Sequence, residues 1–247
     1  MRAQVVAIIV MIAARVEPAR AEPMVLGQGE VYARLVTEVD LAPRRRARPL
    51  SLAPDVWFGV TDALTVGVIH SATSVDRIDA GSSFCVRELS TRCSGLYRGS
   101  GVDLRMKWTP HVAWHVRAVL RDVDPVKPAV TAGALLRWTR GTFIVETDPY
   151  IRVGLAKRDA GNRDALVVPV WLGRRLGDRA SFAVHTGIDG DLAVWRDGWH
   201  VPLGLRFEVT PARAIAFGVE GGFTSLLGPQ NTADQRAIAV YAAYYAR

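Results

Sequence analysis

The sequence lacks most of the features that carry catalytic chemistry or a helical membrane span. Its 247 residues include only two cysteines and five histidines. Beyond the first segment, no stretch is continuously apolar over the roughly 18 residues that a helix needs to cross a bilayer. There is no G-x-S-x-G nucleophile motif, no phosphate-binding glycine loop and no dinucleotide fingerprint. These absences favour a non-enzymatic protein, and we expect neither a cofactor nor a metal site.

The first residues have the pattern of a signal peptide. Met1-Arg2 is a short basic start, residues 3–14 are apolar, and Ala19-Arg20-Ala21 is a small-x-small cleavage site. We therefore predict cleavage after Ala21, which leaves residues 22–247 as a single domain. The alternative is a buried first helix. The removed segment holds three arginines and one glutamate, so the mature chain keeps +5 of the total charge of +7.

The two cysteines lie close together in one polar stretch. Cys85 and Cys93 are eight positions apart, and no histidine lies near either of them. An exported chain meets an oxidising environment, so this spacing predicts a local disulfide between them.

The stretch from Gly101 to Asp122 shows the pattern of the chain most clearly. Apolar and polar residues alternate along two arms that are joined by Thr109-Pro110-His111. Successive strand side chains point to opposite faces and proline favours a tight turn, so this is a predicted hairpin with one apolar and one charged wall. The apolar wall comprises Val102, Leu104, Met106, Trp108, Val112, Trp114, Val116, Ala118 and Leu120.

The same period of two recurs along the chain and predicts twelve strands. They cover residues 30–41, 50–60, 64–72, 102–108, 112–121, 130–138, 143–155, 166–172, 181–189, 199–209, 215–223 and 235–247. Every second connection is long, at 42–49, 73–100, 122–127, 157–164, 190–198 and 224–234, and the others are tight turns. This predicts an all-β fold, an up-and-down antiparallel transmembrane β-barrel of about 12 strands, with both termini on the short-turn side. Both faces of the last strand are apolar, so its register stays open.

Alternation alone does not say which wall of the barrel faces outward. On the apolar wall the aromatic residues gather near the short turns, as in the girdles that outer-membrane barrels place at the membrane interface. The predicted girdle comprises Phe58, Trp108, Trp114, Trp138, Phe143, Phe182, Phe207 and Phe217. The charged wall then lines a hydrated lumen. The predicted lumen residues are Arg34, Glu38, Asp55, Asp103, Arg105, Lys107, His115, Arg117, Arg121, Arg137, Glu146, Asp148, Arg152, His185, Arg206, Glu208 and Glu220.

A soluble barrel with the charged wall outside is the alternative. Soluble up-and-down barrels such as lipocalins use about eight strands, so the strand number favours the membrane interpretation.

The chain from about Glu30 to Arg247 resembles bacterial outer-membrane β-barrel proteins in its signal peptide, its dyad repeats and its girdle. The resemblance implies a place in the bacterial outer membrane, in contact with outer-membrane lipid, and insertion by the barrel-assembly machinery. Members often end in an aromatic residue, whereas here Tyr244-Tyr245 is followed by Ala246-Arg247.

Positive charge is concentrated in one connection, at Arg44-Arg45-Arg46 and Arg48. In an exported barrel we expect this run to contact the phosphates of lipopolysaccharide, or to be simply solvated, and not to bind nucleic acid.

The strand number also bears on function. Twelve strands fall between the roughly eight whose lumen side chains can fill and the roughly sixteen that leave an aqueous channel. We therefore predict a narrow pore or transporter for small polar solutes, a porin-like role. The alternatives are a structural or adhesive barrel and, less favoured, a lipid-modifying enzyme. For the enzyme the available pairs are His70 with Ser71, Ser181 with His185, and His115 with Asp103 or Asp122, but none lies in a catalytic motif.

Overall fold

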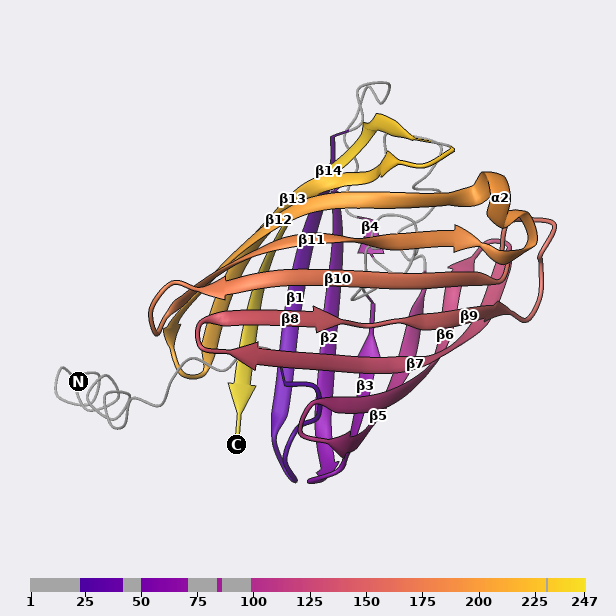
Figure 1. Cartoon of the computed structure of the whole chain (residues 1–247). Helices are drawn as coiled ribbons and strands as arrows, with labels where there is room; N and C mark the ends of the chain where they lie inside the picture. Colours follow the sequence, from indigo (N-terminus) through magenta and orange to yellow (C-terminus); the bar gives the residue numbers. More distant parts are fainter. Residues whose placement is uncertain (1–22, 42–49, 71–83, 86–98, 230) are drawn as a thin grey trace, which may run out of the picture.

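The segments in which apolar and polar residues alternate form the antiparallel strands of a closed ring. Figure 1 shows this ring in the computed structural model. The structure describes residues 23–41, 50–70, 84–85, 99–229 and 231–247. The strands are β1 (Val31–Asp40), β2 (Leu50–Thr61), β3 (Leu64–Ile69), β4 (Phe84–Cys85), β5 (Ser100–Thr109), β6 (Val112–Val123), β7 (Val126–Arg140), β8 (Phe143–Thr147), β9 (Tyr150–Gly154), β10 (Ala165–Arg175), β11 (Ala180–Asp191), β12 (Trp199–Ala212), β13 (Ile215–Leu227) and β14 (Thr232–Ala246). A 3-10 turn, η2 (Leu192–Val194), and a short helix, α2 (Trp195–Gly198), join β11 to β12.

The ring has twelve positions. Apart from β4, β8 and β9, the strands pair in the order in which they follow one another in the chain, with β3 paired to β5. β1 pairs with both β2 and β14, which closes the barrel. β8 and β9 share one position, because both lie between β7 and β10. The short β4 pairs with β2 at Ser51 and Leu52, beyond the residues of β2 that pair with β3, and is additional to the ring. The predicted twelve-stranded antiparallel barrel is confirmed.

β8 and β9 are separated at Asp148-Pro149. Proline has no N–H to donate to a ladder, so the strand is interrupted there. The ladder is partly restored because the carbonyl oxygen of Pro149 accepts a hydrogen bond of 3.0 Å from the backbone N–H of Ala134 on β7.

Two connections are shorter than the sequence predicted. Residues 224–234 were expected to be a long connection, but β13 continues to Leu227 and β14 begins at Thr232. Residues 122–127 were expected to be a long connection, but β6 continues to Val123 and β7 begins at Val126, directly opposite it. The turn is therefore only Asp124-Pro125. The side chain of Asp122 stabilises it by accepting hydrogen bonds from the backbone N–H groups of Val123 and Asp124, as short acidic side chains do in turns.

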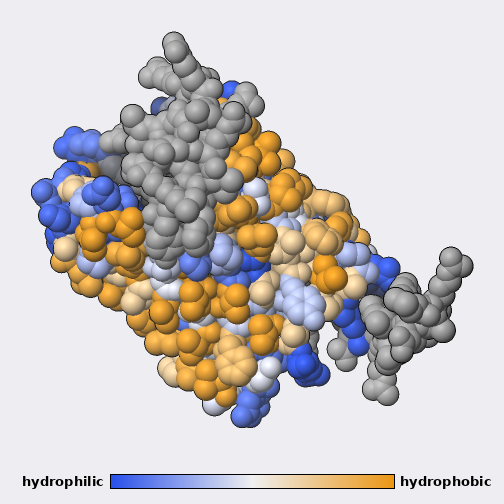
Figure 2. Space-filling model, turned by 180° about the vertical axis from the view of Figure 1, so that it is seen from behind, coloured by the Kyte–Doolittle hydropathy of each residue, from blue (hydrophilic) through white to orange (hydrophobic). Residues whose placement is uncertain are grey.

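The two faces of the barrel wall differ sharply. On β5, the outward Val102, Leu104 and Met106 are 45%, 45% and 56% exposed, whereas the inward Asp103 and Arg105 are 0% and 3% exposed. The same division holds round the ring, and Figure 2 shows apolar side chains spread over the outer surface between more hydrophilic ends. Within the described residues, no helix has both the length and the apolar character to span a bilayer.

The last strand has a fixed register, which the pattern had left open. Its Ala239, Tyr241 and Ala243 are buried inside, while Val240 and Tyr244 are exposed outside. Tyr245, near the end of the strand, faces inward and stacks on Tyr32 with ring centroids 4.6 Å apart. Space for the inward aromatic rings decides this register, because a side chain at Gly218 would overlap the ring of Tyr241.

Residues 23–30 run inside the barrel at the short-turn end, and we call this segment the N-terminal strap. Leu26 is buried against Tyr32 and Trp57, and its backbone N–H donates to Thr65 Oγ1 at 2.8 Å. Gly59 lies so close to the strap that a side chain there would overlap the carbonyl oxygen of Gly27. The strap therefore occupies part of the lumen beside β2 and β3.

Candidate functional site

The inner wall gathers most of the residues that were predicted to line the lumen. Nine of them are buried: Arg34, Glu38, Asp55, Asp103, Arg105, His115, Arg117, Asp148 and His185. Seven are half-buried: Arg121, Arg137, Glu146, Arg152, Arg206, Glu208 and Glu220. Lys107 is exposed beside the short turn between β5 and β6, where the register shifts between Lys107 and Thr109 and ends the strict alternation.

Asp103 lies at the centre of the first polar cluster. Its carboxylate accepts hydrogen bonds from Trp57 Nε1 at 2.9 Å, Arg105 Nε at 2.7 Å and Arg117 Nε at 3.3 Å. Arg117 also donates through Nη2 to Asp148 Oδ2 at 2.9 Å. The cluster thus joins β2, β5 and β6 to the break between β8 and β9.

A second cluster lies around Glu220 on β13. Arg206 donates to one of its oxygens through Nε at 2.9 Å and Nη2 at 2.7 Å, and His185 Nδ1 lies 2.8 Å from the other. Trp171 stacks on His185 with ring centroids 4.6 Å apart, and the Arg206 guanidinium lies 5.3 Å from the centroid of the Trp171 ring. The indole is therefore held between an imidazole and a guanidinium.

Three ion pairs run along the wall between adjacent strands. Arg34 pairs with Asp55 at 3.3 Å, and Arg137 pairs with Glu146 at 2.6 Å. In each case the two residues are direct register partners on adjacent strands, as Arg206 and Glu220 also are. Cross-strand pairs of opposite charge stabilise a sheet. Because they stay within the wall, these pairs do not bridge the lumen.

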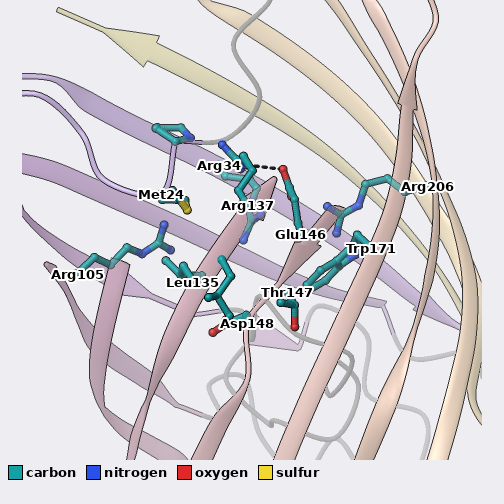
Figure 3. A pocket seen from close by; sticks show the side chains of 12 residues that line it. Met24, Arg34, Arg105, Leu135, Arg137, Glu146, Thr147, Asp148, Trp171 and Arg206 are labelled. Carbon is teal, nitrogen blue, oxygen red and sulfur yellow. Dashed lines mark ion pairs between the residues drawn. The ribbon is translucent and has the colours of Figure 1, made fainter. Parts of the chain in front are cut away.

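Two cavities lie side by side in the lumen, with volumes of about 60 and 70 Å³. Both are lined by Arg34, Glu146, Trp171 and Arg206. Each cavity therefore has room for water. The first, shown in Figure 3, is lined in addition by Pro23, Met24, Arg105, Leu135, Leu136, Arg137, Thr147 and Asp148. The second is lined in addition by Ile144, Gly173, Ser181, Phe182, Ala183, Glu208 and Tyr241.

Several of these lining residues were not singled out from the sequence, among them Trp171, Tyr241 and Met24. Trp171 lies on the inner face of β10, where the alternation of Val170 and Leu172 on the outer face provides a signal for it. Tyr241 depended on the undecided register of the last strand. Met24 reaches the cavity from the N-terminal strap, which has no periodic pattern and gives no such signal.

The predicted girdle residues are all exposed on the outer face, between 37% for Phe182 and 67% for Trp108. Trp108 and Trp114 lie on either side of the turn between β5 and β6 and stack with ring centroids 5.6 Å apart. Aromatic rings therefore stand on the apolar surface beside a short turn.

In the described part of the chain, none of the candidate catalytic pairs places a nucleophile beside a base. His115 Nε2 lies 2.6 Å from Asp148 Oδ1, and His185 faces Glu220, so both interior histidines face carboxylates. Ser71 lies outside the described residues. Among the described residues, no cluster of three or more histidine, cysteine, aspartate or glutamate side chains is placed to hold a metal ion.

Three further predictions fall outside the described residues. The signal peptide lies within residues 1–22, Cys93 lies within 86–98, and the arginine run lies within 42–49. Cleavage after Ala21, the disulfide between Cys85 and Cys93 and the contact with lipopolysaccharide therefore stay predictions.

Comparison with known proteins identifies the fold. No protein-family model and no curated protein sequence matches the chain. Among solved structures, an outer-membrane channel from Pseudomonas putida F1 superposes with a TM-score of 0.53 at 11% identity, covering 94% of this chain and 100% of that one. The outer-membrane protein Omp33 of Acinetobacter baumannii gives a TM-score of 0.44 at 10% identity, covering 88% and 98%. At such low identity the first likeness shows a shared barrel fold.

Proposed function

We propose that this chain is an outer-membrane barrel whose lumen forms a narrow water-filled passage for small polar solutes. The proposal is supported by three features: an apolar outer face, a charged inner face and the two adjoining cavities. The solved channel from Pseudomonas putida F1 has the same fold, which is compatible with this role.

The outer face supports a place in lipid. A soluble protein rarely exposes contiguous apolar surface, whereas a membrane barrel needs an apolar band and aromatic girdles. Here Leu, Val and Phe side chains are exposed on strands all round the ring, among them Val116 on β6, Leu172 on β10 and Leu205 on β12 at 46%, 50% and 53%. By the general rule for such barrels, the short turns and both termini then lie on the periplasmic side.

The direction of the ion pairs carries the functional part of the proposal. If lumen charges paired across the barrel, they would fill and close it. Instead Arg34–Asp55, Arg137–Glu146 and Arg206–Glu220 are pairs between adjacent strands, and water-sized cavities remain beside them. A lumen lined by hydrated charges admits small polar solutes and excludes apolar ones.

One observation favours a second candidate, a closed barrel with a structural role. The N-terminal strap occupies the short-turn end of the lumen, and Pro23 and Met24 line the first cavity. A strap that stays in place blocks part of the passage.

Planar-bilayer recording of the purified, refolded protein tests the two candidates. Discrete conductance steps, together with swelling of vesicles in small sugars, are the expected result. A barrel that shows the heat-dependent gel migration of a folded β-barrel but no conductance would overturn the passage and favour the structural role. Release of fatty acid from phospholipid by the same preparation would instead favour an enzyme.

A further inference from the structure

We propose that the first cavity is a binding site for small oxyanions, namely a carboxylate or phosphate group carried by the solute. This inference rests on the proposed passage and names the class of solute that its narrow part prefers. The site comprises Arg34, Arg105, Arg137, Arg206 and Trp171, which converge on the cavity in Figure 3.

Charge on the cavity lining favours an anion. Four guanidinium groups line the first cavity, against the two carboxylates of Glu146 and Asp148. Both carboxylates are already engaged, Glu146 by Arg137 at 2.6 Å and Asp148 by Arg117 at 2.9 Å. Guanidinium groups bind carboxylates and phosphates through paired N–H donors, so this is an anion-favouring surface.

The carboxylates that hold three of the arginines lie away from the cavity. Asp55, Asp103 and Glu220 pair with Arg34, Arg105 and Arg206, but none of the three lines the cavity. Arg206 binds Glu220 through Nε and Nη2, so its Nη1 group is not used in these bonds. The guanidinium groups therefore stand between their carboxylates and the open space.

Two residues of the cavity lining each carry a buried polar atom without a hydrogen-bond partner among the described residues: Trp171 Nε1 and Thr147 Oγ1. Trp171 is 7% exposed, and its ring is held between His185 and Arg206. A buried N–H without a partner is costly, which makes it a donor for water or for a bound oxygen. Thr147 offers a hydroxyl on the same lining, so the site has neutral donors beside its charges.

The second cavity does not share this preference. Its lining has Arg34 and Arg206 against Glu146 and Glu208, so its charges balance. The Glu208 carboxylate accepts a hydrogen bond of 2.6 Å from the hydroxyl of Tyr241. We therefore assign the oxyanion site to the first cavity, next to the N-terminal strap, while the lumen as a whole stays close to neutral.

The test measures ion preference and binding separately. In a potassium chloride gradient across a planar bilayer, the wild-type reversal potential should show anion preference, and acetate or phosphate should reduce the chloride current. Arg105→Gln removes one positive charge from the cavity, while Asp103 keeps its hydrogen bonds from Trp57 and Arg117. This variant should lower the anion-to-cation permeability ratio at least twofold. Trp171→Phe keeps a ring but removes the N–H donor, and should raise the half-blocking phosphate concentration at least threefold.

The matched control is Arg163→Gln, which removes the same charge from an exposed pair with Asp191 outside the cavity. Equal effects of Arg163→Gln and Arg105→Gln would overturn the site, as would an unselective wild-type channel. Calorimetry of acetate and phosphate with the detergent-solubilised barrel separates the two proposals. Binding to a barrel that does not conduct would refute the passage and keep the site, whereas conduction without anion preference or binding would refute the site alone.

Discussion

At the scale of single residues, glycines on the inner wall make room for large neighbours. A side chain at Gly67 would overlap the indole of Trp57, and one at Gly218 would overlap the ring of Tyr241. Trp57 in turn donates to Asp103. The polar clusters therefore depend on the absence of side chains on adjacent strands.

Gly67→Ala should destabilise the barrel by about 1–3 kcal/mol, the usual cost of overpacking a filled interior. Its new methyl group displaces the Trp57 ring from its bond to Asp103. Urea unfolding in lipid vesicles measures this change. Gly173→Ala is the control, because the atom nearest to a side chain there is 3.4 Å away, an ordinary contact. Equal stabilities of the two variants would contradict the packing argument.

Asp103→Asn should cost roughly 3 kcal/mol of folding free energy, because it leaves two buried guanidinium groups facing a neutral amide. Arg105 and Arg117 are both bonded to Asp103, which is fully buried. The comparison is Asp191→Asn, because the ion pair of Asp191 with Arg163 is more exposed. Its loss should cost less than about 1 kcal/mol of folding free energy. The same unfolding assay applies, and an equally small loss at Asp103 would refute a structural role for its cluster.

At the scale of elements, the N-terminal strap decides how much of the lumen is open. Deleting residues 23–28 removes Met24 from the first cavity and Leu26 from its buried contacts, so single-channel conductance should rise at least twofold. The measurement is planar-bilayer recording at fixed salt.

Gly59→Ala offers a second way to displace the strap with its sequence intact, because the new methyl group would overlap the carbonyl oxygen of Gly27. Gly59→Ala should therefore raise the single-channel conductance, as the deletion does. Gly221→Ala, where the nearest atom is 3.6 Å away, is the wall control and should leave conductance unchanged. Wild-type conductance in both strap variants would show that the strap does not limit the passage.

The strands in which apolar and polar residues alternate with a period of two could be predicted from the sequence. The segments without this period could not. Alternation in β5 and β6 assigned Asp103 and Arg117 to one face because each residue on a strand turns by half a rotation. The strap has no period, so its path follows from packing against Trp57. The turn at Asp124-Pro125 was expected to be longer because polar residues at the strand ends beside it have the composition of a loop, although they continue the hydrogen-bonded ladder of β6 and β7.

The candidate site was partly predictable for the same reason. Its arginines stand out as charges among apolar neighbours on each strand. Trp171 does not stand out, because its neighbours Val170 and Leu172 are apolar as well, and only their alternation indicates that it lies on the inner face. Met24 comes from outside the repeats altogether.

At the scale of the whole molecule, the orientation of the wall toward lipid is testable. Val116 lies near the middle of β6 and is 46% exposed on the outer face. Val116→Arg should therefore cost about 2–4 kcal/mol in a bilayer, the range for arginine at the midplane of a membrane barrel. Val116→Leu is the control and should be close to neutral. If arginine is tolerated as well as leucine in vesicles, the outer face does not meet lipid.

Export of the protein by its signal peptide is also testable. With cleavage after Ala21, N-terminal sequencing of the membrane-extracted protein should begin at Glu22-Pro23, so that the second residue of the mature chain, Pro23, lines the first cavity. A protein that begins at Met1 would contradict export by a cleaved signal peptide.

The seam between β1 and β14 has a consequence for assembly. It pairs Val31 with Ala246, so the ring closes through the contact that is most distant in sequence. An open sheet would present two unpaired edges that lipid cannot satisfy. A chain that ends before β14 would therefore leave the edges of β1 and β13 unpaired. The strap precedes β1 and lies inside the closed ring, so the narrowing of the lumen belongs to the folded barrel itself.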